Sequence, residues 1–341
     1  MESTIASIPH ATPVPGTALD TRPVADVLLA LIWITLTTVT GLMLFGYSRD
    51  YFEYLIYYQS IPKSLSFLDT RFEPGFHVIA WFFRNYLDAD LSTLSLTLAA
   101  VSLAIKFMLF RRYLAHPVFA AILYAVLFFP IHEYTQYRVG IALAFGFWAV
   151  HLLIERRYAW SAILFCLAFS LHYSSSLLLV GAGLGLYVRS RLVVAGTLAV
   201  IVIATVFSSL NYAFEDVLNS LNPLSAAYLQ NSALIESVSI LSVNNLLIVA
   251  ALACYLAAGY HRRGGYHVLM LTMSIACLVP IVLLPDAPVV AQRSKEVLFP
   301  AIIFLSCRSR WTMADLPGLG FVIITTALLG YLWIDGGIIT L

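Results

Sequence analysis

Charged side chains gather in one stretch of this chain, at residues 48–90, between its first two apolar segments. They include Arg49, Asp50, Glu53, Arg71 and Glu73. Because charge is costly near lipid, a cluster kept between two apolar segments is a candidate functional site. Carboxylates there can take a proton from a substrate hydroxyl, and guanidinium groups can hold phosphate oxygens. We therefore take Asp50 and Glu73 as candidates for a catalytic base.

Three residues further along the chain supply cations or ionisable groups for such chemistry. Arg138 opens the apolar segment 137–154, and is either a phosphate clamp or a side chain that snorkels to the membrane surface. His172 interrupts an apolar stretch, and either binds a substrate hydroxyl or phosphate or packs between helices. Arg293 is either a second phosphate ligand or the charged start of a helix.

The sequence predicts no cofactor and no metal cage. Asp50 and Glu53 offer hard oxygen ligands that could hold a divalent ion together with a substrate diphosphate, but their spacing does not require one. The four cysteines lie in or at the ends of apolar runs, and we interpret them as packing residues. They are Cys166, Cys254, Cys277 and Cys307.

The composition decides the class of protein that must position these residues. The chain is 61% apolar and 11% charged, with a mean hydropathy of +0.88. Soluble domains are typically about 45–50% apolar and about 25% charged, so this composition predicts an all-α polytopic membrane protein. The net charge of +1 and the lack of a basic arm give no indication of nucleic-acid binding.

The apolar runs define the expected membrane spans. They lie at about 25–46, 91–110, 116–131, 137–154, 158–187, 192–210, 244–260, 266–284, 294–308 and 317–334. Basic clusters follow several of them, at Arg111-Arg112, Arg156-Arg157, Arg189 and Arg191, His261-Arg262-Arg263, and Arg308 and Arg310. The positive-inside rule assigns these clusters to the cytoplasmic side.

Two segments need an interpretation to satisfy that rule. The run 158–187 has basic residues at both ends, so we expect two short helices that turn near His172, with one long tilted helix as the alternative. Residues 74–87 are amphipathic and short for a span, so we expect a helix lying along the membrane interface. The chain then makes about eleven crossings.

The resulting arrangement is a single transmembrane domain at 25–341. A disordered cytoplasmic tail at 1–24 precedes it, and the C-terminus lies outside. The external loops are expected at 48–90, 132–136, 211–243 and 285–293, besides the turn near His172.

Most of the unusual polar residues fall on the external side in this arrangement. They are Asp50, Glu53, Arg71, Glu73, His77, His132, Glu133, Arg138, His172, Arg293 and Glu296. The asymmetry predicts an active site that faces outward. Lys106 lies within an apolar run five residues before Arg111, and we interpret it as snorkelling to the cytoplasmic surface.

Short motifs in a fixed order resemble those of a known family. They are Arg49-Asp50-Tyr51 with Tyr54, Phe72-Glu73-Pro74-Gly75-Phe76, Tyr137-Arg138-Val139-Gly140-Ile141-Ala142, Ser170-Leu171-His172-Tyr173-Ser174 and Arg293-Ser294-Lys295-Glu296. Together they are similar to the EpsG family, which belongs with the Wzy-type polysaccharide polymerases of bacterial envelopes. The chain departs from the family pattern at Val139, where a polar residue often follows the motif arginine.

The resemblance implies a GT-C-like inner-membrane protein that acts on undecaprenyl-diphosphate-linked glycans at the periplasmic face. It suggests polymerisation of repeat units for O-antigen, capsule or exopolysaccharide, with a flippase and a chain-length regulator as possible partners. Asp50 is slightly favoured over Glu73 as the base, because GT-C-like proteins usually carry an acidic residue early in the first external loop. Asp50 could instead orient Arg71 or Arg138 through an ion pair. The expected substrate-binding residues are Arg49, Tyr54, Arg71, Arg138, His172 and Arg293.

Two other functions remain open from the sequence. One is a membrane acyltransferase that modifies surface glycans, with His172 as base and Arg138 holding the acyl donor. The other is a flippase for lipid-linked oligosaccharides, which predicts internal repeats and cations along a central cavity. The gathering of charge at one face favours the polymerase.

Overall fold

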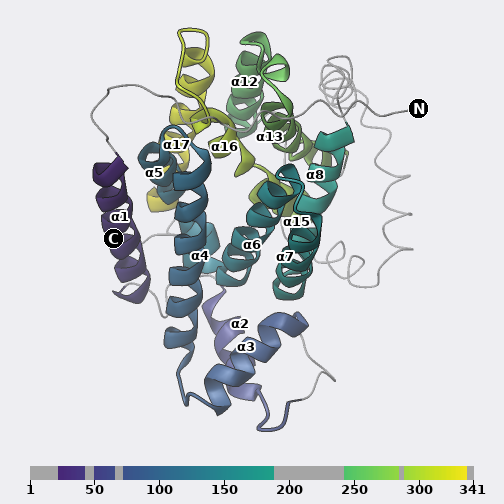
Figure 1. Ribbon diagram of the computed structural model, residues 1–341. Helices are drawn as coiled ribbons and strands as arrows, with labels where there is room; N and C mark the ends of the chain where they lie inside the picture. The colour runs from purple at the N-terminus through teal and green to yellow at the C-terminus, as the bar shows by residue number, and fades with distance from the viewer. Residues whose placement is uncertain (1–21, 43–49, 66–71, 188–241, 284–287, 336–341) are drawn as a thin grey trace, which may run out of the picture.

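The computed structural model describes residues 22–42, 50–65, 72–187, 242–283 and 288–335, which form helices and no strand (Figure 1). The first half contains α1 Arg22–Leu42, α2 Tyr51–Ser60, α3 Pro74–Asn85, α4 Leu91–Tyr113, α5 Pro117–Leu127, the π-helix η1 Pro130–Thr135, α6 Tyr137–Ile154, α7 Tyr158–Leu171, the short η2 Tyr173–Ser175 and α8 Ser176–Tyr187. The second half contains α12 Val243–Ala257, η5 Tyr260–Arg262, α13 Gly265–Ala276, α14 Val279–Leu283, α15 Pro288–Leu298, α16 Ala301–Cys307 and α17 Leu316–Asp335.

Four helical stretches of the described residues are long and apolar enough to cross a membrane. They are Arg22–Gly41, Leu91–Tyr113, Tyr137–Ile154 and Gly265–Val282. Five shorter apolar helices accompany them, and many large apolar side chains stay exposed on the bundle surface, as lipid contact allows. The protein is therefore an all-helical membrane protein, while the number of eleven crossings stays a prediction.

Several expected segments lie outside the described residues. They are most of the tail at 1–24, the apolar run 192–210, nearly all of the loop 211–243, and the basic residues Arg189 and Arg191.

The run 158–187 forms two helices, α7 and α8, separated by His172 and η2. Gly146 of α6 lies against both Ala168 of α7 and Leu178 of α8. Ten residues of continuous helix would place Ala168 and Leu178 about 15 Å apart, so the chain must reverse between them. The two-helix interpretation of this run is thus the one that the structure follows.

The helices α2 and α3 pack together at one end of the bundle, the lower end in Figure 1. The helix expected at 74–87 is present as α3, and its position along a membrane interface remains a proposal. We did not predict α2, although Tyr54, Tyr57 and Tyr58, which form its buried face, stand at helical spacing in the sequence.

Two further expectations were wrong in detail. The segment 132–136, expected as an external loop, belongs largely to the π-helix η1, in which His132 and Glu133 are buried. The run 294–308, expected as one span, is divided into α15 and α16 near Pro300, because proline supplies no N–H and interrupts a helix.

Candidate functional site

Glu73 lies at the centre of a charged cluster at the α2–α3 end of the bundle. It precedes α3 with an extended backbone, and Pro74 begins the helix with the φ angle that a first turn requires. One carboxylate oxygen of Glu73 accepts a hydrogen bond from Nδ1 of His172 at 2.5 Å. The other accepts one from Nη1 of Arg138, which makes a buried ion pair. Residues far apart in sequence thus meet at one carboxylate.

A glycine in the first turn of α3 makes this meeting possible. A Cβ atom at Gly75 would lie only 2.8 Å from the carbonyl oxygen of Ser170, near the end of α7. Only a residue without a side chain permits so close an approach of the two helices. The contact brings Glu73 within reach of His172, which follows directly after α7.

Aromatic rings and a tyrosine hydroxyl hold the guanidinium of Arg138. Its Nε donates a hydrogen bond to the Tyr54 hydroxyl at 3.0 Å. The guanidinium carbon, Cζ, lies 3.8 Å from the centre of the Phe72 ring. The side chain is 14% exposed. Among the described residues its Nη2 group has no hydrogen-bond partner, so two N–H donors remain for a substrate oxygen.

The electrostatics of the cluster favour an ionised Glu73 beside a neutral His172. Burial alone would raise the pKa of Glu73, but the hydrogen bond from His172 and the charge of Arg138 lower it to about 2. Burial lowers the pKa of His172, and the neighbouring Glu73 carboxylate opposes that effect only in part. A neutral His172 that donates from Nδ1 has a lone pair on Nε2. No described residue binds that Nε2, so it can accept a proton.

Arg293 and Asp50 lie beside this cluster without contacting Glu73. Arg293 donates to Gln136, the residue before α6, and to Glu296 at 3.0 Å. Its positive charge contributes, after burial, to the lowered pKa of His172. Asp50 precedes α2, and its negative charge adds to the burial that raises the pKa of Tyr54. Both residues therefore act electrostatically on the members of the cluster.

The structure thus brings together most of the residues predicted from the sequence. Tyr54, Glu73, Arg138 and His172 contact one another, with Asp50 and Arg293 adjacent. Arg49 and Arg71 lie outside the described residues. Our predictions did not include Phe72 or Gln136 as site residues, although Phe72 belongs to one of the motifs and Gln136 adjoins another. In the described ranges, no three His, Cys, Asp or Glu side chains are grouped to hold a metal ion.

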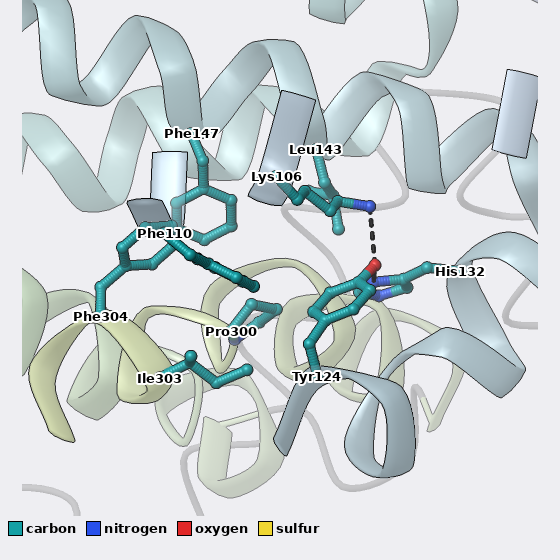
Figure 2. Close-up of a pocket in the computed structure, with 9 residues that line it drawn as sticks. All are labelled: Lys106, Phe110, Tyr124, His132, Leu143, Phe147, Pro300, Ile303 and Phe304. Atoms are coloured by element: carbon teal, nitrogen blue, oxygen red, sulfur yellow. Dashed lines mark hydrogen bonds between the residues drawn. The ribbon is translucent and has the colours of Figure 1, made fainter. Parts of the chain in front are cut away.

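A second charged cluster lies inside the bundle and corrects the prediction for Lys106. This residue does not reach the membrane surface: it is 4% exposed, and its Nζ lies 2.5 Å from Glu133 of η1. Figure 2 shows its ammonium facing the hydroxyl of Tyr124, at 2.6 Å, among otherwise largely apolar side chains. Snorkelling fails here because Glu133 offers the cation a partner within the bundle.

Comparisons with known proteins assign the chain to one family. No curated protein and no solved structure matches the chain significantly. The sequence model of the EpsG family matches residues 26–335, which is nearly the whole chain. The motif residues Glu73, Arg138, His172 and Arg293 all fall within the match. The chain therefore belongs to the EpsG family of membrane proteins, which are similar to Wzy-type polysaccharide polymerases.

Proposed function

We propose that this protein polymerises lipid-linked oligosaccharide repeat units by glycosyl transfer at the membrane face that carries α2 and α3. The donor is a glycan on a polyprenyl diphosphate such as undecaprenyl diphosphate, and the acceptor is a second lipid-linked glycan. The product is an envelope polysaccharide of the O-antigen, capsule or exopolysaccharide kind. The observation that carries this proposal is the single carboxylate, Glu73, that joins a histidine base to an arginine with free donors.

The reaction requires the transfer of a proton and the release of a diphosphate. The acceptor hydroxyl attacks the anomeric carbon of the donor, its oxygen forms the new glycosidic bond, and the carbon–oxygen bond to the diphosphate breaks. The hydroxyl proton passes to a base, and the diphosphate leaves as an anion without needing a proton. The site must therefore supply one base and at least one well-placed cation.

His172 is the group best placed to act as that base. Its Nε2 is unbound among the described residues, and its Nδ1–H is held by Glu73. Glu73 is a weak base because its pKa lies near 2 and both of its oxygens are already bound. We therefore assign to Glu73 the orientation of His172 and Arg138. Asp50, directly before the neighbouring helix α2, stays as the alternative base.

Arg138 is the proposed ligand of the leaving diphosphate. Tyr54 and Glu73 fix its Nε and Nη1, so the remaining donors have a defined direction. A planar guanidinium suits two phosphate oxygens at once. Arg293 lies close enough to act on His172 electrostatically and is proposed as a second phosphate ligand, together with Arg49 and Arg71.

The distribution of arginines supports a periplasmic position for this site in a bacterial inner membrane. The opposite end of the bundle carries Arg111 and Arg112 in the last turn of α4, and Arg156 and Arg157 between α6 and α7. The positive-inside rule places that end, with the N-terminus, in the cytoplasm. The α2–α3 end then faces the periplasm, where lipid-linked repeat units are polymerised.

The test is polymer synthesis by the protein reconstituted in lipid vesicles with a lipid-linked repeat unit. We expect Glu73→Gln to lower the rate by about 10²–10⁴-fold, because it loses the anion that orients both the base and the clamp. The matched control is Glu155→Gln, whose carboxylate pairs with Arg112 at 2.7 Å at the opposite end. Equal chain-length distributions for wild type and Glu73→Gln would contradict the proposal.

The same vesicles separate the polymerase from the alternative functions. A His172–Glu73 pair could also activate a hydroxyl for acyl transfer, so the assay contains no acyl donor. Growth of the glycan from the lipid-linked unit alone supports glycosyl transfer. Movement of the unit across the bilayer without any growth would indicate a flippase.

A further inference from the structure

We propose that the buried Lys106–Glu133 ion pair is a positioning device for the active site. It holds the turn from η1 into α6 and thereby fixes the two residues, Gln136 and Arg138, that reach into the site. The inference rests on the proposed function, because Arg138 matters to it as the ligand of the diphosphate. Lys106 and Glu133 themselves contact no substrate in this proposal.

The ammonium of Lys106 joins four separate elements. Besides Glu133 of η1, it contacts Ser102 of its own helix α4 at 2.8 Å, Tyr124 of α5 at 2.6 Å and the carbonyl oxygen of Gly140 in α6 at 2.9 Å. An ammonium group has three N–H donors, and here four oxygens surround it. Its capacity is therefore used entirely within the protein.

Glu133 is equally enclosed. Its carboxylate accepts hydrogen bonds from Ser102 at 2.9 Å and from Tyr124 at 2.8 Å, and its side chain is fully buried. A buried ion pair contributes little net stability, because the desolvation of both charges offsets their attraction. An apolar pair of similar size would stabilise the bundle as well, so a role in fixing geometry explains the ion pair better than stability does.

The backbone around Gly140 shows what the pair holds in place. A Cβ atom at Gly140 would lie 2.5 Å from the carbonyl oxygen of His132 and 3.1 Å from the carboxylate of Glu133. The π-helix η1 and the first turn of α6 therefore touch directly. Such π-helical turns are rare, and they are frequently found at functional sites.

Two site residues lie on the short segment that leaves this contact. Gln136, between η1 and α6, accepts a hydrogen bond from Arg293. Arg138, two residues before Gly140, pairs with Glu73 and Tyr54. Inside the bundle, the ammonium of Lys106 donates a hydrogen bond to the carbonyl oxygen of Gly140. At the α2–α3 end, Glu73 pairs with the side chain of Arg138. If the interior contact is lost, η1 can relax, and both Gln136 and Arg138 lose their defined positions.

The experiment removes the pair as a unit. Lys106→Met and Glu133→Met are made singly and together, in full-length protein in lipid vesicles. Each single variant leaves one buried charge without a partner, and we expect its Tm to fall by about 10 °C. In the double variant the apolar pair restores the Tm. Its polymerisation rate nevertheless stays about 100-fold low, because Arg138 is misplaced.

A second measurement reads the geometry without any reaction. Thr135 ends η1 and is 8% exposed, and a cysteine there keeps a similar size. We expect a membrane-impermeant maleimide to label the Thr135→Cys protein only slowly when Lys106 and Glu133 are intact. Labelling should be much faster when Thr135→Cys is combined with Lys106→Met and Glu133→Met. The same two proteins without Thr135→Cys give the background labelling of the four native cysteines.

The matched control is Tyr266→Phe, which removes a buried 3.0 Å hydrogen bond to His151 at the other end of α6. It should lower the Tm while leaving the polymerisation rate and the labelling unchanged. A double variant that polymerises at the wild-type rate, or that remains as unstable as the single variants, overturns the proposal. Unchanged labelling of Thr135→Cys also overturns it, even if the wild type makes no polymer and the proposed function itself fails.

Discussion

Two buried glutamates anchor charged clusters near the start of α6, and the difference between the clusters lies in what the partners of each glutamate leave free. Glu73 pairs with Arg138 and His172, each of which is 14% exposed and keeps unbound donor or acceptor capacity. Glu133 pairs with Lys106, whose side chain is 5% exposed and whose ammonium is surrounded by four protein oxygens. The first cluster can still bind a substrate, while the second is saturated.

This difference separates the proposed reactive cluster around Glu73 from the proposed supporting cluster around Glu133 by chemistry rather than by charge. Both contain a carboxylate, a cation and a tyrosine. A group acts on a substrate only if it has a donor or acceptor that the protein has not used. Breaking either ion pair leaves an uncompensated buried charge, which costs about 3–5 kcal/mol. We therefore expect losses of stability at both clusters, but direct chemical defects only at the first.

Next to Glu73→Gln, the largest effect is expected for Arg138→Lys. A lysine keeps the positive charge near Glu73 but loses the fork of donors that binds Tyr54, Glu73 and a phosphate at the same time. We expect polymerisation to fall by about 10²–10³-fold, measured as the initial rate of chain growth in vesicles. A wild-type rate in this variant would make Arg138 a snorkelling residue, which is the alternative that the sequence left open.

Two glycines allow the clusters to be disturbed separately, with effects of intermediate size. Gly75→Ala should force α3 away from Ser170 and so separate Glu73 from His172. Gly140→Ala should force η1 away from α6. We expect each to lower the polymerisation rate by about 10–100-fold. Gly183→Ala is the control, because a Cβ atom there meets nothing within 4 Å.

Tm values distinguish the two glycine variants from each other. Gly140→Ala displaces buried backbone near an ion pair, so its free energy of unfolding should fall by about 1–3 kcal/mol. Gly75→Ala acts at the end of the bundle, where fewer groups are buried, and should cost less. Equal Tm values for the two variants would contradict the division into an interior cluster and an end cluster.

The sequence grouped the residues around Glu73 better than those around Glu133, for a physical reason. Glu73, Arg138 and His172 follow or precede apolar runs, so the positive-inside rule places them on one face before any contact is known. Lys106 was misplaced because its distance in sequence from Arg111 suggested snorkelling. A signal was available in Ser102, which lies four residues before Lys106 on the same face of α4 and forms part of its cluster.

The fold shows the same division between local and long-range information. The apolar helices and the turn at His172 follow from hydropathy and charge, whereas no hydropathy pattern indicates the π-helix η1 or its close contact with Gly140. The pairing of Lys106 with Glu133, 27 residues away, likewise depends on how α4 and η1 pack. Side chains that meet across helices cannot be paired from hydropathy alone.

The pH dependence of the rate tests the assignment of the base. If Nε2 of His172 takes the proton, activity is complete above the ordinary histidine pKa of about 6.5 and falls as the pH drops through the pKa of His172. Burial lowers that pKa, and the charge of Arg293 lowers it further. Arg293→Gln should therefore move the fall in rate to higher pH.

The opposite shift is expected for the residual activity of Glu73→Gln. The carboxylate of Glu73 raises the pKa of His172, so removing its charge should move the fall in rate to lower pH. Rate–pH profiles from the same vesicle assay measure both shifts. Profiles that coincide with wild type in both variants would point to Asp50 as the base instead.

The smallest effect is expected for Tyr54→Phe, which tests how firmly Arg138 must be held. The variant keeps the ring that packs 4.3 Å from the Tyr137 ring and removes only the hydroxyl that accepts from Nε of Arg138. One hydrogen bond of this kind contributes about 0.5–1.5 kcal/mol, so the rate should fall roughly 2- to 10-fold. Because Glu73 still binds Nη1, the guanidinium keeps its place and loses only its orientation. A loss as large as that of Arg138→Lys would instead show that the Tyr54 hydroxyl contacts the substrate, which would extend the reactive cluster onto α2.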